Sequence, residues 1–166
     1  MKKIYLLAAV SVLTLGYAEV WAAQATGEGN ISAKIVAPVT VTETQGLDFG
    51  TILAPTDSAK TVTISTAGSR SDDGSGILVN TNKGKAGLFN VTGADSQTMT
   101  ITKPSPVELT STGGDKMTVN NFVTEPANNL TLSGTSGQIK VGADLTVNKD
   151  QAVGDYTGTY TVTVSY

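Results

Sequence analysis

Residues 31–41 read ISAKIVAPVTV, and every second residue of this stretch is apolar. The apolar positions are Ile31, Ala33, Ile35, Ala37, Val39 and Val41. This alternation is the period of a β-strand that buries one face. Pro38 has no backbone N–H to give to a ladder, so it keeps such a strand out of the centre of a sheet. Two interpretations follow: the stretch is the first strand of the protein's own sheet, or it is an arm whose apolar side fills a groove in another subunit.

The remaining sequence predicts more short strands, separated by turns rich in glycine, asparagine and aspartate. We expect them at residues 47–53, 61–65, 77–81, 87–92, 98–102, 107–110, 117–123, 130–132, 139–147 and 156–166. The polar stretch 67–76, AGSRSDDGSG, is expected to be an exposed surface loop that includes the sole arginine, Arg70. No window beyond residue 22 shows the apolar spacing of a helix. The expected fold class is therefore all-β, an antiparallel β-sandwich.

Residues 1–22 have the pattern of a secretory signal peptide. Lys2 and Lys3 supply its positive start, residues 4–15 its apolar run, and residues 20–22 its cleavage site. The apolar run is shorter than the about 20 residues that a membrane-spanning helix needs, and no later run is longer. We therefore expect an exported chain with no membrane span after cleavage.

The composition narrows the possible functions. The 11 basic and 14 acidic residues fall to nine and 13 once Lys2, Lys3 and Glu19 are removed, which gives no bias toward nucleic acid. Histidine and cysteine are absent, so the usual general base, thiol nucleophile and transition-metal ligands are missing. We expect no enzyme activity, no metal and no cofactor. Asp72 and Asp73 lack the spacing of a calcium loop, and a solvated turn is the favoured interpretation there.

Three motifs in the sequence resemble a known family. They are residues 47–50 (LDFG: Leu47, Asp48, Phe49 and Gly50), residues 141–147 (VGADLTV) and residues 154–166 (GDYTGTYTVTVSY). In order and spacing they resemble a family of exported Gram-negative β-proteins that is known only as a domain of unknown function. The first and last motifs are also similar to the spore coat protein U type pilins of archaic chaperone–usher fimbriae. The resemblance covers nearly the whole chain after the signal peptide.

The resemblance implies an immunoglobulin-like, pilin-like sandwich over residues 39–166 that lacks one strand, preceded by an arm over residues 23–38. The arm, at about residues 29–37, would act as the donor strand for a neighbouring subunit. The implied donor-strand residues are Ile31, Ala33, Ile35 and Ala37. The implied groove and chaperone-facing strand carries Tyr156, Tyr160, Val162, Val164 and Tyr166. Two features depart from such pilins: Ser165 stands next to last, where tyrosine is common, and no disulfide is possible.

The expected function is that of a structural subunit of a surface fimbria or pilus, exported through the periplasm to the cell surface. The implied partners are copies of the chain or related subunits, a periplasmic chaperone and an outer-membrane usher. The alternative is a stand-alone secreted adhesin or biofilm-matrix protein, with its N-terminal strand packed in its own sheet. A hydrolase or carbohydrate-binding module is a third interpretation, and the latter would need several aromatic side chains exposed together.

Overall fold

The computed structural model describes residues 24–166, so the expected signal peptide at residues 1–22 and Ala23 lie outside the described residues. The described part forms eleven β-strands and no helix, and all its strand pairs are antiparallel. This confirms the expected all-β, antiparallel class. Within residues 24–166 there is also no helix that is long and apolar enough to cross a membrane.

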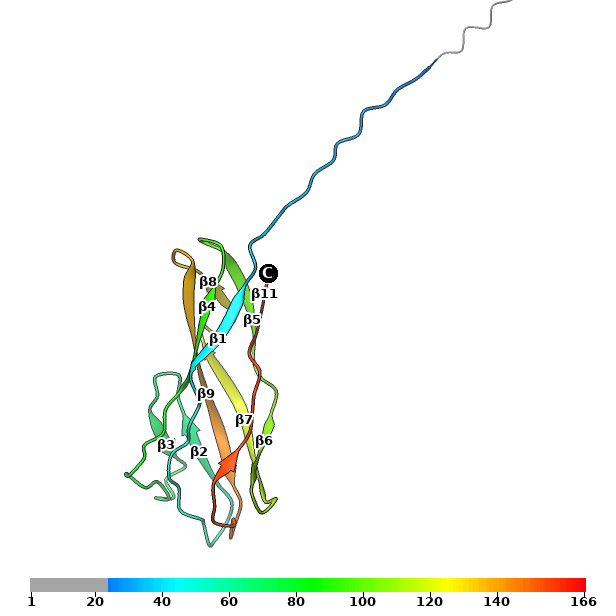
Figure 1. Cartoon of the computed structure of the whole chain (residues 1–166). Coiled ribbons are helices and arrows are strands. Elements are labelled where there is room, and N and C mark those ends of the chain that lie inside the picture. Colours follow the sequence, from blue (N-terminus) through cyan, green and yellow to red (C-terminus); the bar gives the residue numbers. More distant parts are fainter. Residues whose placement is uncertain (1–23) are drawn as a thin grey trace, which may run out of the picture. The chain divides into compact units, whose positions relative to one another are not determined.

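Residues 35–166 form one compact unit that contains all eleven strands. The strands are β1 (Thr40–Gln45), β2 (Lys60–Ile64), β3 (Arg70–Asp72), β4 (Gly87–Thr92), β5 (Thr98–Thr102), β6 (Val107–Ser111), β7 (Lys116–Glu125), β8 (Asn129–Thr131), β9 (Ser136–Val147), β10 (Tyr156–Thr157) and β11 (Thr163–Ser165). The larger sheet has the order β1-β4-β9-β7-β6-β10, with β2 on β9 and β3 on β2. The smaller sheet has the order β11-β5-β8, and together the sheets curl into a half-barrel (Figure 1).

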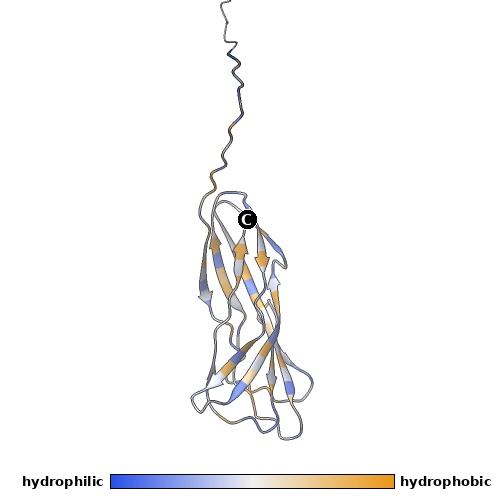
Figure 2. Cartoon of the chain, turned by 90° about the vertical axis from the view of Figure 1, so that its right-hand side faces the viewer, coloured by the Kyte–Doolittle hydropathy of each residue, from blue (hydrophilic) through white to orange (hydrophobic). Residues whose placement is uncertain are grey.

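The core of this unit is built on β9, which pairs with β2, β4 and β7. Alternate β9 residues are buried, and hydrophobic and hydrophilic residues alternate along the strands in Figure 2. The buried β9 side chains are Ile139, Val141, Ala143, Leu145 and Val147. Burial of the four larger side chains contributes about 1.5–3 kcal/mol each and that of Ala143 less, which makes this strand the main hydrophobic support of the fold.

Most of the predicted strands are confirmed. The predictions at residues 87–92 and 98–102 match β4 and β5 residue for residue, and β2, β6, β7, β8 and β9 fall within a few residues of their predicted bounds. The predictions at 47–53 and 77–81 are wrong as continuous strands. These two stretches meet only in an isolated bridge between Ile52 and Leu78. In residues 47–53 the left-handed backbone at Gly50, with φ of +74°, breaks the extended conformation, and in residues 77–81 the chain enters a turn at residues 80 and 81.

The predicted surface loop at residues 67–76 is wrong at its centre, because β3 lies there. β3 pairs with β2, so that Ile64 stands opposite Arg70 and Val62 opposite Asp72. Arg70 is half-buried instead of exposed. The sequence pattern did not predict this strand, because β3 has no apolar face of its own. Its stability comes from pairing with the buried strand β2.

The prediction of a strand over residues 31–41 is wrong for most of its length, since β1 begins only at Thr40. Ile31 is 98% exposed and Ile35 is 96% exposed. Alternation of apolar residues requires a neighbouring strand before it can produce a ladder, and residues 24–39 pair with no strand of the described chain. The interpretation that this stretch is the first strand of its own sheet is therefore not what the structure shows.

The predicted last strand, residues 156–166, is divided in two. Tyr156 and Thr157 pair with β6 of the larger sheet, whereas β11 pairs with β5 of the smaller sheet. Residues 158–162 lie between these pairings and belong to no strand of the described chain. The division follows from a change of partner, because the chain passes here from one sheet to the other.

Candidate functional site

The LDFG motif at residues 47–50 forms a tight turn that is fixed by Asp48. The Asp48 carboxylate accepts hydrogen bonds from the backbone N–H of Gly50 at 2.7 Å and from the side-chain amide of Asn82 at 3.2 Å. The backbone of Asp48 pairs with that of Lys85 through two further hydrogen bonds, at 2.9 and 2.8 Å. The motif therefore joins this stretch of chain to the turn that precedes β4.

Arg70 holds the same stretch from β3. Its Nη1 donates to the carbonyl oxygens of Phe49 and Thr51, each at 3.0 Å, and its Nη2 donates to the carbonyl of Val79. The planar guanidinium is suited to bonding several oxygens at once. Sequence reasoning missed this role, and the one available signal was that Arg70 is the sole arginine.

The apolar residues of the motif point into the protein. Phe49 is 7% exposed and belongs to the core, and Leu47 is half-buried against it. Leu47 and Phe49 also contribute to a cavity beside the motif. The hydrogen bonds of Asp48 and Arg70 thus hold the backbone of residues 48–51, which lines one side of this cavity.

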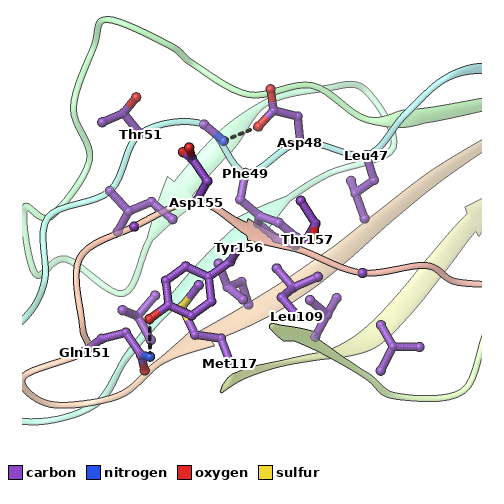
Figure 3. A pocket seen from close by; sticks show the side chains of 18 of the residues that line it. Leu47, Asp48, Phe49, Thr51, Leu109, Met117, Gln151, Asp155, Tyr156 and Thr157 are labelled. Carbon is purple, nitrogen blue, oxygen red and sulfur yellow. Dashed lines mark hydrogen bonds between the residues drawn. The ribbon is translucent and has the colours of Figure 1, made fainter. Parts of the chain in front are cut away.

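The cavity has a volume of about 660 Å³ and lies between two stretches of chain, residues 46–54 and residues 151–160 (Figure 3). Its floor is apolar and comes from β6, β7 and β9. The floor residues are Val107, Leu109, Met117, Val119, Phe122, Leu145 and Val147. The first wall pairs with its neighbours only through isolated bridges, and much of the second belongs to no strand. An extended segment placed between the walls would therefore find backbone groups to pair with.

Two tyrosines on the second wall differ in their hydrogen bonding. The Tyr156 hydroxyl donates to the carbonyl of Ala152 at 2.7 Å and accepts from the Gln151 amide at 2.8 Å, as Figure 3 shows for Gln151. The Tyr160 hydroxyl is buried without a partner. Burial first, and then the nearby charge of Glu43, raises the pKa of Tyr160 to about 12.

The predicted C-terminal groove strand is only partly at the cavity. Tyr156 and Tyr160 line it, whereas Val162 and Val164 pack in the core next to the smaller sheet. Tyr166 is 53% exposed, and its hydroxyl donates to the carbonyl of Ala37. The five residues thus lie in three different places, the cavity, the core and the surface, and do not line one groove.

The predicted donor-strand residues have exposed side chains. Ile31, Ala33, Ile35 and Ala37 are all exposed, in a stretch without secondary structure. What the structure shows is an alternating apolar segment whose large side chains have no apolar neighbour to cover them.

The cavity combines an apolar floor with three acidic lining residues. Its charged lining residues are Glu43, Asp48 and Asp155. Among the described residues, no group of three or more acidic, histidine or cysteine side chains is placed to hold a metal ion. Of the six aromatic residues within residues 24–166, Tyr166 alone is exposed, so they form no shared platform for a sugar ring.

Together, the fold and the cavity define an all-β domain, an antiparallel half-barrel with an apolar cavity beside its last segment. The chain belongs to the family described as "Domain of unknown function (DUF4402)", whose model matches residues 39–166. This confirms the expected membership of an all-β family of unknown function. A comparison with curated proteins found no match.

Proposed function

We propose that the chain is a structural subunit of a surface fimbria and that it polymerises by donor-strand exchange. In this mechanism residues 29–37 of one copy fill the cavity of another. The half-barrel is then an immunoglobulin-like, pilin-like sandwich that lacks one strand, and the cavity is the place of that strand. The observation that carries the proposal is the presence in one chain of an uncovered alternating apolar segment and an apolar cavity between two incompletely paired walls.

The sizes of the segment and the cavity agree. Residues 29–37 and the wall at residues 46–54 each comprise nine residues, and the nine residues of the segment span roughly 30 Å when extended, at about 3.3 Å per residue. The wall is shorter than this, because its backbone turns at Gly50. The segment can therefore run along the length of the wall. Its alternating side chains would place one face toward the apolar floor and the other toward solvent.

The energetic gain is that of burying exposed apolar side chains. Ile31 and Ile35 are almost completely exposed. Burial of each contributes about 1.5–3 kcal/mol, and covering the cavity floor adds to this. On the opposite face of the segment, Lys34 carries the charge that complements the acidic lining residues Glu43, Asp48 and Asp155.

The connection to β1 favours a neighbouring copy as acceptor over the chain's own cavity. To lie beside β1, the segment would have to reverse direction at Pro38 and Val39. The tight primed turns that suit hairpins need positive φ at the first central residue, but proline holds φ near −65°. Val39 is half-buried and packs toward Gly93, which further fixes this connection.

Export through the periplasm completes the proposed function. An uncovered apolar groove and open strand edges promote aggregation, so a subunit of this kind needs a chaperone before assembly. A periplasmic chaperone and an outer-membrane usher are the partners we propose, with copies of the chain or related subunits in the fibre. The alternative is a stand-alone secreted adhesin or biofilm-matrix protein, and the experiment must distinguish it from a subunit that polymerises.

The test is an SDS gel of protein sheared from the native cell surface, with matched samples left unheated and boiled. Donor-strand exchange predicts a ladder in steps of one subunit mass that collapses to monomer on boiling, because the chain has no cysteine to hold the steps covalently. Monomer in both lanes, together with a sharp thermal transition in solution, would favour the stand-alone adhesin or matrix protein.

A further inference from the structure

The proposed donor segment leaves the half-barrel without a flexible linker. Val39 is half-buried and packs toward Gly93, and the hydroxyl of Tyr166 donates to the carbonyl of Ala37. The last residue of the segment is therefore bonded to its own half-barrel, and only Pro38 and Val39 separate it from β1. When the segment enters the cavity of a second copy, the two half-barrels must lie directly against each other.

The two walls of the cavity run in opposite directions, which defines its two ends. At one end Glu43 pairs with Phe89, whose ring packs edge-on against Tyr160 with centroids 5.8 Å apart. At the other end the backbone N–H of Asp150 donates to the carbonyl of Pro55 at 2.8 Å. The first end is followed by the rest of β1 and by β11. The second end lies at the loops before β2 and after β9, at the tip of the half-barrel opposite β11 and the C-terminus (Figure 1).

A copy inside a fibre both donates its segment and receives one. Its arm end, the surroundings of Ala37 and Tyr166, faces the copy that takes its segment. The copy that donates to it must therefore lie at the opposite tip. We call this tip the loop end, and its cavity residues include Leu53 and Val153. Repetition of one such head-to-tail contact produces an open filament.

The most exposed large apolar side chains of the half-barrel lie at these two ends. Within residues 40–166, Val153 is the most exposed, at 93%, and Leu53 follows at 55%. The third is Tyr166 of the arm end, at 53%. Single apolar side chains on a surface need no explanation, but these three occupy the two surfaces that would meet in a fibre.

We infer that the loop end is a docking surface for the arm end of a second copy, with Leu53 and Val153 of the receiving copy packed against Tyr166 of the donating copy. This inference rests on the proposed function. It gives consecutive half-barrels an apolar contact in addition to the inserted segment. Because the hydroxyl of Tyr166 also holds Ala37, the contact fixes the base of the segment where it enters the cavity.

The experiment compares two measurements on chains with and without the pair Leu53→Ser and Val153→Ser. Insertion alone is measured with a fluorescent peptide of residues 24–37, titrated against full chains whose own segment is disabled by Ile31→Asn and Ile35→Asn. Insertion together with docking is measured on fibres with an intact segment, sheared from cells that produce each variant, as the rate of monomer release in urea. Val123→Ser is the matched control, because Val123 is 44% exposed on β7 and does not line the cavity.

We expect the Leu53 and Val153 pair of substitutions to speed monomer release about tenfold, because it removes apolar contact between half-barrels. Peptide binding should weaken much less, since the peptide carries no arm end. Tyr166→Ser should also speed release, and should add little when it is combined with the pair, because substitutions of residues in contact are not additive. Val123→Ser should leave the release rate unchanged.

Three results would overturn the inference and leave donor-strand exchange intact. They are release no faster for the pair than for Val123→Ser, an equal loss in peptide binding and in fibre stability, and full additivity of the pair with Tyr166→Ser. If the peptide binds none of the chains, or the cells carry no fibre of the wild-type chain, the proposed function itself is contradicted, and the inference fails with it.

Discussion

Gly50 and Gly84 pack backbone against backbone, with no room for a side chain on either. A Cβ atom on Gly50 would lie 2.7 Å from the Gly84 nitrogen, and one on Gly84 would lie 3.1 Å from the Gly50 nitrogen. Both residues have positive φ, +74° and +71°. The close approach brings the LDFG motif onto the turn before β4 and fixes the wall of the cavity, so the glycine of the motif has a structural role.

Gly50→Ala should destabilise the protein by about 3 kcal/mol, from the combined cost of the left-handed backbone and the steric overlap. Urea unfolding followed by circular dichroism measures the change. Gly74→Ala is the matched control, because Gly74 also has positive φ, +86°, but no atom lies within 4 Å of its added Cβ. Equal losses for both variants would contradict the packing role of Gly50.

Arg70→Lys should also be destabilising, by roughly 2 kcal/mol, because a lysine cannot reach the three carbonyl groups that the guanidinium bonds at once. The free energy of unfolding in urea gives the magnitude. Lys83→Arg, at an exposed site, is a control expected to stay within about 0.5 kcal/mol of the wild type. If Arg70→Lys left the free energy of unfolding unchanged, the carbonyl contacts of Arg70 would contribute nothing to stability.

Tyr160 should make stability depend on alkaline pH. Its pKa is about 12 in the folded chain, against an ordinary value of 10.0 in the unfolded chain. Since the folded pKa is the higher one, the contribution is complete below pH 10 and is lost as the pH rises through about 12. Urea midpoints measured from pH 9 to 12 should fall more steeply for the wild type than for Tyr160→Phe. Tyr166→Phe, at an exposed tyrosine, should retain the steep fall, and identical slopes for all three chains would contradict this prediction.

The two faces of the arm should differ in their importance for assembly. Ile31→Asn with Ile35→Asn removes the side chains that we propose to enter the cavity, and we expect it to abolish the heat-sensitive ladder. Ser32→Asn with Val36→Asn places the same two asparagine side chains on the opposite face, and the ladder should persist. Because these positions are exposed, neither pair should change the free energy of unfolding of the monomer in urea by more than about 0.5 kcal/mol. Equal loss of the ladder in both pairs would contradict an alternating insertion.

Strands with a clear side-chain pattern between turn residues could be predicted from the sequence. β4 and β5 are bounded by turn residues and were predicted residue for residue, and β9 shows its buried face directly in its alternation. In such strands the side-chain pattern and the turns agree, so local information suffices.

The rest depends on partners that a sequence pattern does not identify. Alternation continues through residues 156–166, but β10 and β11 pair with different sheets, and the ladder stops between them. Gly158 marks this change, since an added Cβ there would lie 2.8 Å from the Glu108 carbonyl oxygen. Residues 31–39 show the same limit, because alternation indicates that one face can be buried but not which molecule buries it. Arg70 was missed because its partners are backbone carbonyls, which carry no sequence signature.

The most direct test of segment insertion uses the absence of cysteine from the chain. Ala33→Cys is co-assembled with a second copy that carries a cysteine on the cavity floor, at Leu109, Met117 or Val119 in turn. Under mild oxidation and boiling without reductant, we predict a disulfide-linked dimer with at least one floor position. The control partner carries Thr131→Cys, at an exposed site on β8 outside the cavity, and should give only background. Dimer yields no higher for every floor position than for Thr131 would contradict the insertion of the arm into the cavity.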